Sequence, residues 1–369
     1  MKFSQNTALV FLRPKAIIKL YKWPVIAKPV RTPAVAIRFF NREIVQIPTV
    51  ASFLRNGKKT TAKKGVKYIM ELRHVLGGTY VAVGATALLP LYKLNDTDVV
   101  LLDTGYAKLD RSGLTHLLED NRFQLKGILC SHAHFDHTGN VRYLQNRYGA
   151  VAAAQIIEAG ISVNPDAYRA NYVPLTYGRS RKYFLEECFI ADVIIPADAT
   201  ELTFCGAKFG ILQLPGHSAG HIGIITPDGV AYLGDCLISR SQIDEAKLPT
   251  SMFIARDLES KRSLYFLHCP AYIVAHKEVF TDITDLIGEN IRFIESKAQE
   301  MLDCLTDGMT FDQWIYEFCK RENVRTHNEL KFSVVERNFA NFAAWMEDEG
   351  TITIRREFCA KKYYHGSAE

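Results

Sequence analysis

Four side chains that can bind a metal ion lie within six consecutive residues of this 369-residue chain. The segment from His132 to His137 reads HAHFDH and follows a largely apolar run at 125–130, with one serine between them. Imidazole and carboxylate groups are common ligands of divalent cations such as zinc. Residues 132 and 134 point the same way if strand geometry continues, whereas a turn can direct Asp136 and His137 to a second point. The spacing therefore indicates a site for two metal ions.

Three further candidate ligands follow predicted strands later in the chain. His217 comes after an apolar run at 209–214, and His276 ends a short apolar run of its own. Asp235 follows Gly234, where the absence of a side chain permits a sharp turn at a strand end. Asp235 can bridge two cations.

Two divalent cations about 3.5 to 4 Å apart can share a water, lower its pKa to about 7 and present hydroxide to a carbonyl or phosphorus. The cations also neutralise the oxyanion that develops. Asp136 is the predicted catalytic residue, because it can bind one cation and also accept a hydrogen bond from the nucleophile. Ser131 is expected to form a supporting hydrogen bond and not to act as a nucleophile. Zinc fits these ligands best, with iron and manganese as alternatives.

Alternating strand and helix patterns surround the candidate ligands. Strands are predicted at 80–83, 89–94, 99–103, 127–130, 151–154, 202–204, 209–214, 222–226, 230–233 and 271–274. Helices are predicted at 112–119, 141–148, 180–188, 258–266, 281–304, 310–322 and 328–349, followed by a hairpin of strands at 351–354 and 357–364. This α+β mixture predicts two sheets packed face to face with helices outside and ligand loops at strand ends. The insertion at 155–200 is expected to form either a lid or a peripheral helical layer.

The order of these motifs resembles the metallo-β-lactamase superfamily of binuclear zinc hydrolases. The resemblance runs from about residue 80 to residue 276 and includes the segment Asp103-Thr104-Gly105 ahead of the first ligands. It implies an αββα sandwich in which the loops at strand ends converge on the metals. It also implies that Asp103 steadies the ligands and that His221 does not bind metal directly.

The resemblance implies a division of the ligands into two groups, with two Zn²⁺ per chain. One ion is expected on His132, His134 and His217. The other is expected on Asp136, His137 and His276, with Asp235 between the two ions.

The function that this resemblance implies is metal-dependent hydrolysis, in which a metal-bridging hydroxide attacks a thioester, ester, lactone or similar carbonyl of a small substrate. Glyoxalase II-like and lactonase-like branches act in this way. Two alternatives stay open, namely a nuclease of the same superfamily and a persulfide dioxygenase with one iron. The flavodiiron branch is disfavoured, because it usually has Glu where this chain has His134 and because no flavin domain follows.

Charge is distributed unevenly along the chain. Residues 1–69 contain fifteen Lys and Arg against one acid, Glu43, whereas the whole chain has a net charge of +5, so the remainder is acidic. This proline-containing leader is predicted to be disordered or dispensable, and a transit peptide or an over-extended translation start would explain it. Residues 70–280 are predicted as the catalytic domain and residues 281–369 as a helical, winged-helix-like module.

Composition also limits the partners of the protein. No segment approaches the roughly 18 apolar residues of a membrane span, and the eight cysteines form no Cys-x-x-Cys pair, which predicts a cytoplasmic protein with reduced thiols. Residues 307–369 carry nine Lys and Arg against eleven Asp and Glu, which disfavours nucleic-acid binding. The aromatic residues of this region are expected to contact the catalytic domain, to form a homodimer contact or to build a core of their own: Trp314, Phe318, Phe339, Phe342 and Trp345.

Overall fold

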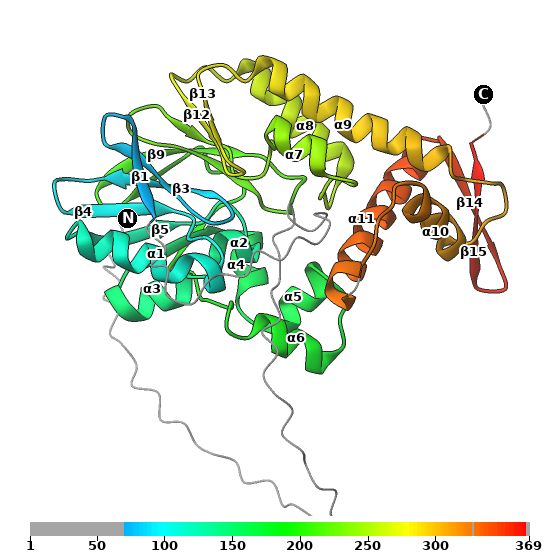
Figure 1. Ribbon diagram of the computed structural model, residues 1–369, viewed down its shortest axis with the longest axis horizontal. Coiled ribbons are helices and arrows are strands. Elements are labelled where there is room, and N and C mark those ends of the chain that lie inside the picture. Colours follow the sequence, from blue (N-terminus) through cyan, green and yellow to red (C-terminus); the bar gives the residue numbers. More distant parts are fainter. Residues whose placement is uncertain (1–69, 327, 367–369) are drawn as a thin grey trace, which may run out of the picture. The chain divides into compact units, whose positions relative to one another are not determined.

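The computed structural model of the chain describes residues 70–326 and 328–366 (Figure 1). The predicted leader at 1–69 lies outside the described residues. Within them, the strands form two large sheets and one separate hairpin. Among the described helices, none is long and apolar enough to cross a membrane.

The first sheet contains seven strands that follow one another in chain order. They are β1 (Glu71–Leu76), β2 (Thr79–Val83), β3 (Leu88–Lys93), β4 (Asp98–Leu102), β5 (Gln124–Leu129), β6 (Val151–Gln155) and β7 (Val193–Ile195). Strands β1 to β4 pair antiparallel, whereas β4 to β7 pair parallel. The parallel part requires crossover connections, which α1 (Ala107–Asp120) and α3 (Val141–Tyr148) provide. As a result, the segments that follow β4 and β5 emerge at the same edge of the sheet.

The second sheet has the strand order β13-β12-β11-β10-β9-β8. Its strands are β8 (Glu201–Phe204), β9 (Ala207–Gln213), β10 (Ile222–Ile225), β11 (Ala231–Tyr232), β12 (Tyr272–Val274) and β13 (Glu278–Phe280). Only β11 and β12 pair parallel, and the connection between them contains α7 (Arg240–Glu245), α8 (Ile254–Ser263) and a short 3-10 helix at Leu264–Phe266.

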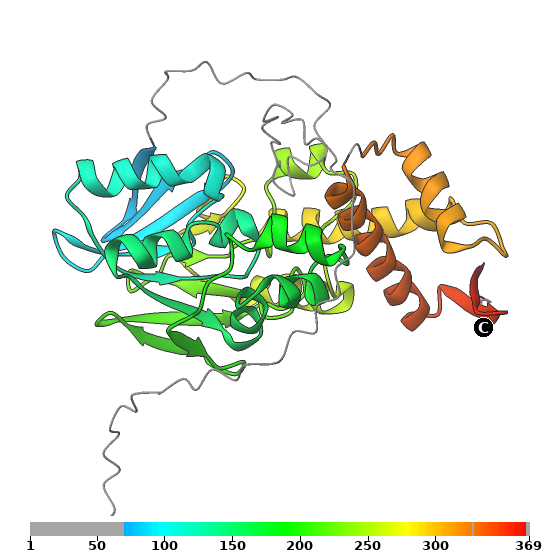
Figure 2. The same cartoon turned by 90° about the horizontal axis from the view of Figure 1, so that it is seen from below.

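The two sheets share one apolar core. Leu89, Leu101 and Ile128 of the first sheet belong to the same buried cluster as Phe209 and Ile224 of the second. Helices α1 and α3 bury apolar side chains against the outer face of the first sheet, and α9 (Thr284–Leu302) does the same for the second (Figures 1 and 2). The predicted αββα sandwich with a C-terminal helical extension is therefore confirmed.

The insertion at 155–200 contains α4 (Ile156–Ser162), α5 (Pro165–Asn171) and α6 (Tyr177–Phe184). Tyr168 and Phe184 are fully buried in a cluster that joins Ala133 of the ligand segment to Leu330 and Val334 near the C-terminus. The predicted helix at 180–188 begins three residues earlier, at Tyr177, and ends at Phe184. The insertion is thus a packed helical layer beside the ligand segment.

The C-terminal region contains α10 (Phe311–Arg321), α11 (Glu329–Asp348) and the antiparallel strands β14 (Ile352–Glu357) and β15 (Ala360–His365). Thr310 and Asn328 begin the two helices by accepting hydrogen bonds from backbone N–H groups. Trp314, Phe318, Phe339 and Phe342 are fully buried in a cluster that also includes Leu248, Ile254 and Leu258, and Trp345 packs against it. The aromatic residues therefore build a shared core with α8, whereas the boundary at residue 280 and the homodimer contact stay predictions.

Candidate metal centre

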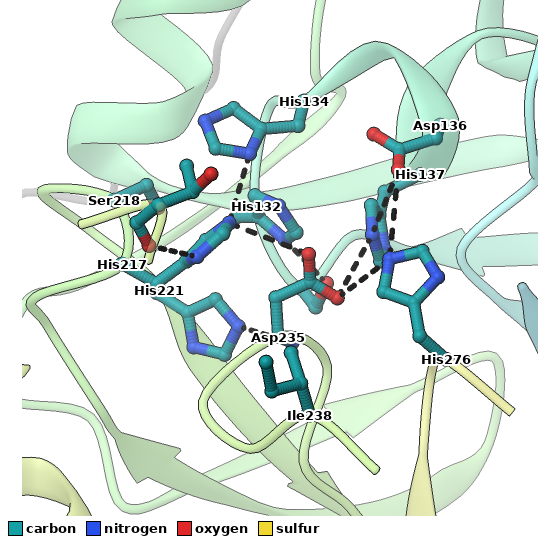
Figure 3. A network of polar contacts seen from close by, with 12 residues as sticks. His132, His134, Asp136, His137, His217, Ser218, His221, Asp235, Ile238 and His276 are labelled. Carbon is teal, nitrogen blue, oxygen red and sulfur yellow. Dashed lines mark hydrogen bonds and ion pairs between the residues drawn. The ribbon is translucent and has the colours of Figure 1, made fainter. Parts of the chain in front are cut away.

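All seven predicted ligands lie beyond strand ends, where they are buried together. His132 and His134 follow β5, and Asp136 and His137 belong to the single turn of α2 (Phe135–Thr138). His217 lies between β9 and β10, Asp235 follows β11, and His276 follows β12. Figure 3 shows these side chains pointing toward one another.

The first group consists of three imidazoles. His134 Nδ1 lies 2.9 Å from His217 Nε2, and the ring centroids of His132 and His134 are 4.5 Å apart. One nitrogen from each of these three rings lies within 4.8 Å of the others, a spacing that allows one ion to be shared.

The second group consists of two carboxylates and two imidazoles, and its ligand atoms also lie within 4.8 Å of one another. Asp235 Oδ1 is 3.2 Å from His137 Nε2 and 3.3 Å from His276 Nε2. Asp136 Oδ2 is 3.6 Å from the same His276 nitrogen. The other oxygen of Asp235, Oδ2, is 3.4 Å from His217 Nε2 in the first group. Asp235 therefore lies between the two groups (Figure 3).

The hydrogen bonds outside these groups determine which atoms face inward. Nδ1 of His217 lies 2.9 Å from the carbonyl oxygen of Thr250, and Nδ1 of His276 lies 3.0 Å from that of Thr86. Nδ1 of His137 lies 2.8 Å from Asp103 Oδ2. Since these oxygens can only accept, each Nδ1 carries the proton, and in a neutral ring Nε2 presents a lone pair.

The inward-facing atoms are thus mostly acceptors that lack donors. Among the described residues, the inward-facing buried atoms without a hydrogen-bond partner include one nitrogen of each of His132, His137 and His276 and one oxygen of each of Asp136 and Asp235. Burying unpaired acceptors against one another is unfavourable, and a divalent cation would satisfy them. The residues present therefore fit the divalent metal that the sequence predicts.

The electrostatic environment differs between the two groups. Burial, with the neighbouring imidazoles, lowers the pKa of His132 and His134 well below the ordinary value, and burial lowers the pKa of His217 to about 3. Burial would also lower the pKa of His137, but the carboxylates of Asp235 and Asp136 raise it well above the usual range. The first group is therefore neutral and available for a metal, whereas protons compete with a metal at the second.

Asp103 connects several parts of the centre. Its carboxylate accepts hydrogen bonds from the backbone and hydroxyl of Ser131, at 2.7 and 2.6 Å, and from the hydroxyl of Tyr232 at 2.6 Å, in addition to the His137 ring. The Ser131 hydroxyl also lies 3.0 Å from His132 Nδ1. These contacts orient the rings of predicted ligands in both groups, which is the role that the resemblance implies for Asp103 and that was expected for Ser131.

Glu158, in the first turn of α4, joins the two loops that supply the first group. Its carboxylate accepts hydrogen bonds from Ala133 N–H at 2.8 Å, from the Ser218 hydroxyl at 2.7 Å and from Gly220 N–H at 2.7 Å. Burial raises the pKa of Glu158, and these three donors oppose the rise. Glu158 therefore holds the loop of His132 and His134 at a fixed distance from the loop of His217.

His221 lies outside both groups of predicted ligands. Its Nε2 accepts a hydrogen bond of 3.1 Å from the backbone N–H of Asp235. A Cβ at residue 234 would lie 2.6 Å from this nitrogen, so Gly234 is required for the approach. The geometry agrees with a supporting role for His221.

The structure brings together every one of the seven predicted ligands, although their binding of metal stays a prediction. The sequence motifs did not indicate Tyr232, Glu158 and Thr250, whose contacts orient the predicted ligands and their loops. None of these three lies in a recognisable motif. Of the three, only Tyr232 has a sequence feature that could have indicated its role, because its hydroxyl group stands in an otherwise apolar strand.

Comparison with known proteins identifies the class to which this fold and centre belong. The sequence profile of the metallo-beta-lactamase superfamily matches residues 91–276, which is half of the chain. The chain belongs to the metallo-beta-lactamase superfamily. The resemblance predicted from the motifs is thereby confirmed.

Two curated relatives are hydroxyacylglutathione hydrolases. That of Shewanella baltica (strain OS155) is 30% identical over 148 residues, which cover 39% of this chain and 44% of that enzyme. Hydroxyacylglutathione hydrolase GloC of Haemophilus influenzae is 30% identical over 146 residues, which cover 39% of this chain and 63% of that enzyme. The matched region spans about half the length of these relatives.

Two solved structures share the fold over a larger part of the chain. One is a metallo-beta-lactamase family protein of Thermus thermophilus, with a TM-score of 0.60 and 17% sequence identity. The aligned region covers 79% of this chain and 99% of the Thermus protein. The other is a beta-lactamase domain protein of Burkholderia ambifaria, with a TM-score of 0.61 and 13% sequence identity. The aligned region covers 82% of this chain and 98% of the Burkholderia protein. These similarities concern the fold and extend beyond residues 91–276.

Proposed function

We propose that this protein is a metal-dependent hydrolase that binds two divalent cations, most favourably zinc, and hydrolyses the C–S or C–O bond next to a carbonyl group of a small substrate. The observation that carries the proposal is the position of Asp235, whose two oxygens lie 3.2 to 3.4 Å from imidazole nitrogens of both groups. A shared carboxylate between two sets of acceptors is typical of a binuclear site.

The residues have separate roles in the proposal. His132, His134 and His217 hold one cation, whereas Asp136, His137 and His276 hold the other, with Asp235 shared. Cations bound there lower the pKa of a water molecule and polarise a substrate carbonyl. Among the described residues, one buried oxygen of Asp136 has no hydrogen-bond partner, so it can accept a proton or a hydrogen bond from that water.

The substrate class is proposed from the relatives. Hydroxyacylglutathione hydrolases are named for cleavage of a thioester-containing compound, so a thioester or ester is the first candidate class, with a lactone as a related carbonyl. The chain matches only part of those enzymes, and the substrate is therefore proposed as a chemical class and not as one compound.

Single-residue replacements test this function. We expect His132→Ala and Asp136→Ala each to abolish thioester hydrolysis, because each removes a proposed ligand, while circular dichroism stays unchanged. His268→Ala is the matched control, since His268 is exposed outside the centre. Full turnover by either ligand variant contradicts the proposal.

Metal analysis of the purified protein separates the proposal from its alternatives. Two zinc ions per chain favour hydrolysis, whereas a single iron favours a persulfide dioxygenase. Hydrolysis of single-stranded nucleic acid with no activity on thioesters or esters would favour a nuclease.

A further inference from the structure

His276, a proposed ligand of the second group, is oriented by a loop of the first sheet. Its Nδ1 lies 3.0 Å from the carbonyl oxygen of Thr86, in the loop at 84–87 that connects β2 to β3. At the end of this loop, Leu88 N–H donates a hydrogen bond of 2.7 Å to the carbonyl oxygen of Ala275. The position of the 84–87 loop therefore influences where the His276 ring lies.

The 84–87 loop is bound to a buried carboxylate on α1. Asp110 is 1% exposed, and its Oδ1 accepts a hydrogen bond of 2.6 Å from Ala85 N–H. Its Oδ2 accepts hydrogen bonds from the Thr86 hydroxyl at 3.3 Å and from Tyr106 N–H at 2.9 Å. One side chain thus joins the 84–87 loop to the segment that follows β4.

The segment that follows β4 orients another proposed ligand of the same group. Asp103 lies in this segment, and its Oδ2 is 2.8 Å from Nδ1 of His137. His137 and His276 thus depend on two different stretches of chain, and Asp110 is hydrogen-bonded to both stretches. Asp110 therefore has the same relation to the second group that Glu158 has to the first.

The close approach of Asp110 depends on two glycines. A Cβ at Gly84 would lie 3.1 Å from Asp110 Oδ1 and 2.5 Å from the Ala87 carbonyl oxygen, and a Cβ at Gly105 would lie 2.7 Å from Asp110 Oδ2. The loop is also bound to the segment after β12, because Lys277 Nζ donates a hydrogen bond of 3.0 Å to the Gly84 carbonyl oxygen. Contacts on two elements therefore hold the 84–87 loop in one position.

We propose that Asp110 is a positioning residue for the second group of ligands and controls the affinity of the ion that this group holds. This inference rests on the proposed binuclear hydrolase. The hydrogen bonds of Asp110 go to the two stretches of chain and not to a ligand ring, so its effect on the ion passes through the Thr86 carbonyl and Asp103. Residues that orient metal ligands in this way change metal affinity when they are replaced.

Zinc titration of variants that keep one ion tests this role. His134→Ala should leave the ion of the second group, and His276→Ala should leave the ion of the first. Added to His134→Ala, Asp110→Asn is expected to weaken the remaining ion about tenfold, because asparagine has one acceptor oxygen and either Ala85 or Tyr106 loses the acceptor of its N–H. Added to His276→Ala, the same change should alter the affinity by less than about twofold.

Two further variants separate positioning from charge. Gly84→Ala changes no charge but displaces the loop, so it should also weaken the ion that remains in His134→Ala. Asp120→Asn removes an exposed carboxylate from the same helix and should leave both ions unchanged. An unchanged ion in Asp110→Asn or in Gly84→Ala, or equal weakening of both ions by Asp110→Asn, would overturn the positioning role while leaving the hydrolase function intact.

Hydrogen exchange of the metal-free protein provides a readout that does not depend on zinc. Loss of the acceptor for Ala85 N–H should make the amides of residues 84–88 exchange about tenfold faster in Asp110→Asn than in the native protein, with no change in Asp120→Asn. Mass spectrometry of the peptide that contains these residues measures the rate. If the native chain binds no zinc, the hydrolase proposal fails, and unchanged exchange in Asp110→Asn would show separately that Asp110 does not hold the loop.

Discussion

Glu158 illustrates how one buried side chain controls the distance between two ligand loops. It accepts hydrogen bonds from Ala133 in the first loop and from Ser218 and Gly220 in the second. A carboxylate is suited to this position because both of its oxygens accept hydrogen bonds, whereas an amide group of the same size has one acceptor and one donor.

We therefore expect Glu158→Gln to weaken zinc binding about tenfold, because at least one buried donor loses its acceptor, at a cost of about 1–3 kcal/mol. Competition with a chromogenic chelator measures the dissociation constant. Glu186→Gln replaces an exposed glutamate and serves as the control. Equal zinc affinity in native protein and Glu158→Gln would show that Glu158 does not position the loops.

The buried carboxyl group of Glu187 predicts how the stability of the fold depends on pH. Burial raises the pKa of its carboxyl from 4.5 to about 7, with Arg111 and Lys108 opposing the rise, and one of its oxygens has no hydrogen-bond partner among the described residues. Because the pKa is raised in the folded state, the protonated Glu187 carboxyl contributes fully to the free energy of unfolding below pH 4.5. This contribution is lost as the pH rises through about 7.

The expected loss is on the order of 3 kcal/mol. Glu187→Gln removes the ionisation. Near pH 4.5 the variant and the native protein should therefore unfold at the same urea concentration, whereas at about pH 8 the variant should be more stable than the native protein. A native protein that matches the variant at both pH values would disprove the assignment.

At the scale of elements, the loop between β9 and β10 depends on one glycine. Gly216 has a φ of +143°, and a Cβ at this position would lie 2.2 Å from the Asp257 Cα in α8. The neighbouring His217 is oriented by the carbonyl of Thr250, whose loop is in turn held to α11 by a hydrogen bond of 2.9 Å from Asn341 to Ser251. Close packing of this loop therefore determines the position of a proposed ligand.

We expect Gly216→Ala to lower the free energy of unfolding by about 2–4 kcal/mol, since backbone strain adds to a steric clash, and to reduce zinc binding in parallel. Gly178→Ala is the matched control, because a Cβ at residue 178 would have no atom within 4 Å and α6 tolerates alanine. Urea unfolding and zinc titration of both variants check this expectation, which similar results for the two alanines would refute.

The elements differ in how well the sequence predicts them. The helix at Val141–Tyr148 has the predicted bounds, because its apolar period and the glycine that follows are local signals. Strand β1 was not predicted, since it is an edge strand with largely exposed side chains. The short helices α4 and α5 were also missed, because contacts with Ala133 and Val334 stabilise them and these residues are distant in sequence.

Contacts between residues that are distant in sequence also explain which parts of the centre could not be predicted. The seven proposed ligands lie in short sequence motifs at strand ends. Tyr232, by contrast, reaches Asp103 across 129 residues of sequence, and Glu158 reaches Gly220 across 62. Such contacts depend on the packing of the two sheets and the insertion, which no local pattern encodes.

At the scale of the whole described chain, the C-terminal helices share a core with the segment between Asp235 and His276. Trp314 is fully buried, donates a hydrogen bond of 2.7 Å to the Met301 carbonyl oxygen and contacts Phe339. Leu248 and Leu258 belong to the same cluster. We infer that the C-terminal region contributes to the stability of the metal-binding part.

We expect Trp314→Ala to lower the free energy of unfolding by about 3–5 kcal/mol, because it removes a large buried side chain and a hydrogen bond. Tyr316→Ala, on the same helix but 62% exposed, should change it by less than about 0.5 kcal/mol. Circular dichroism during urea unfolding provides the measurement, and a small effect of Trp314→Ala would mean that this core contributes little.

Zinc titration of the metal-free protein tests the proposed binuclear centre most directly. For the native chain we predict two bound zinc ions. His134→Ala and His276→Ala remove one proposed ligand from each group, so each variant should keep one tightly bound ion and lose the other. Two tight ions in both variants, or no tight zinc binding by the native chain, would contradict a centre built from these seven residues.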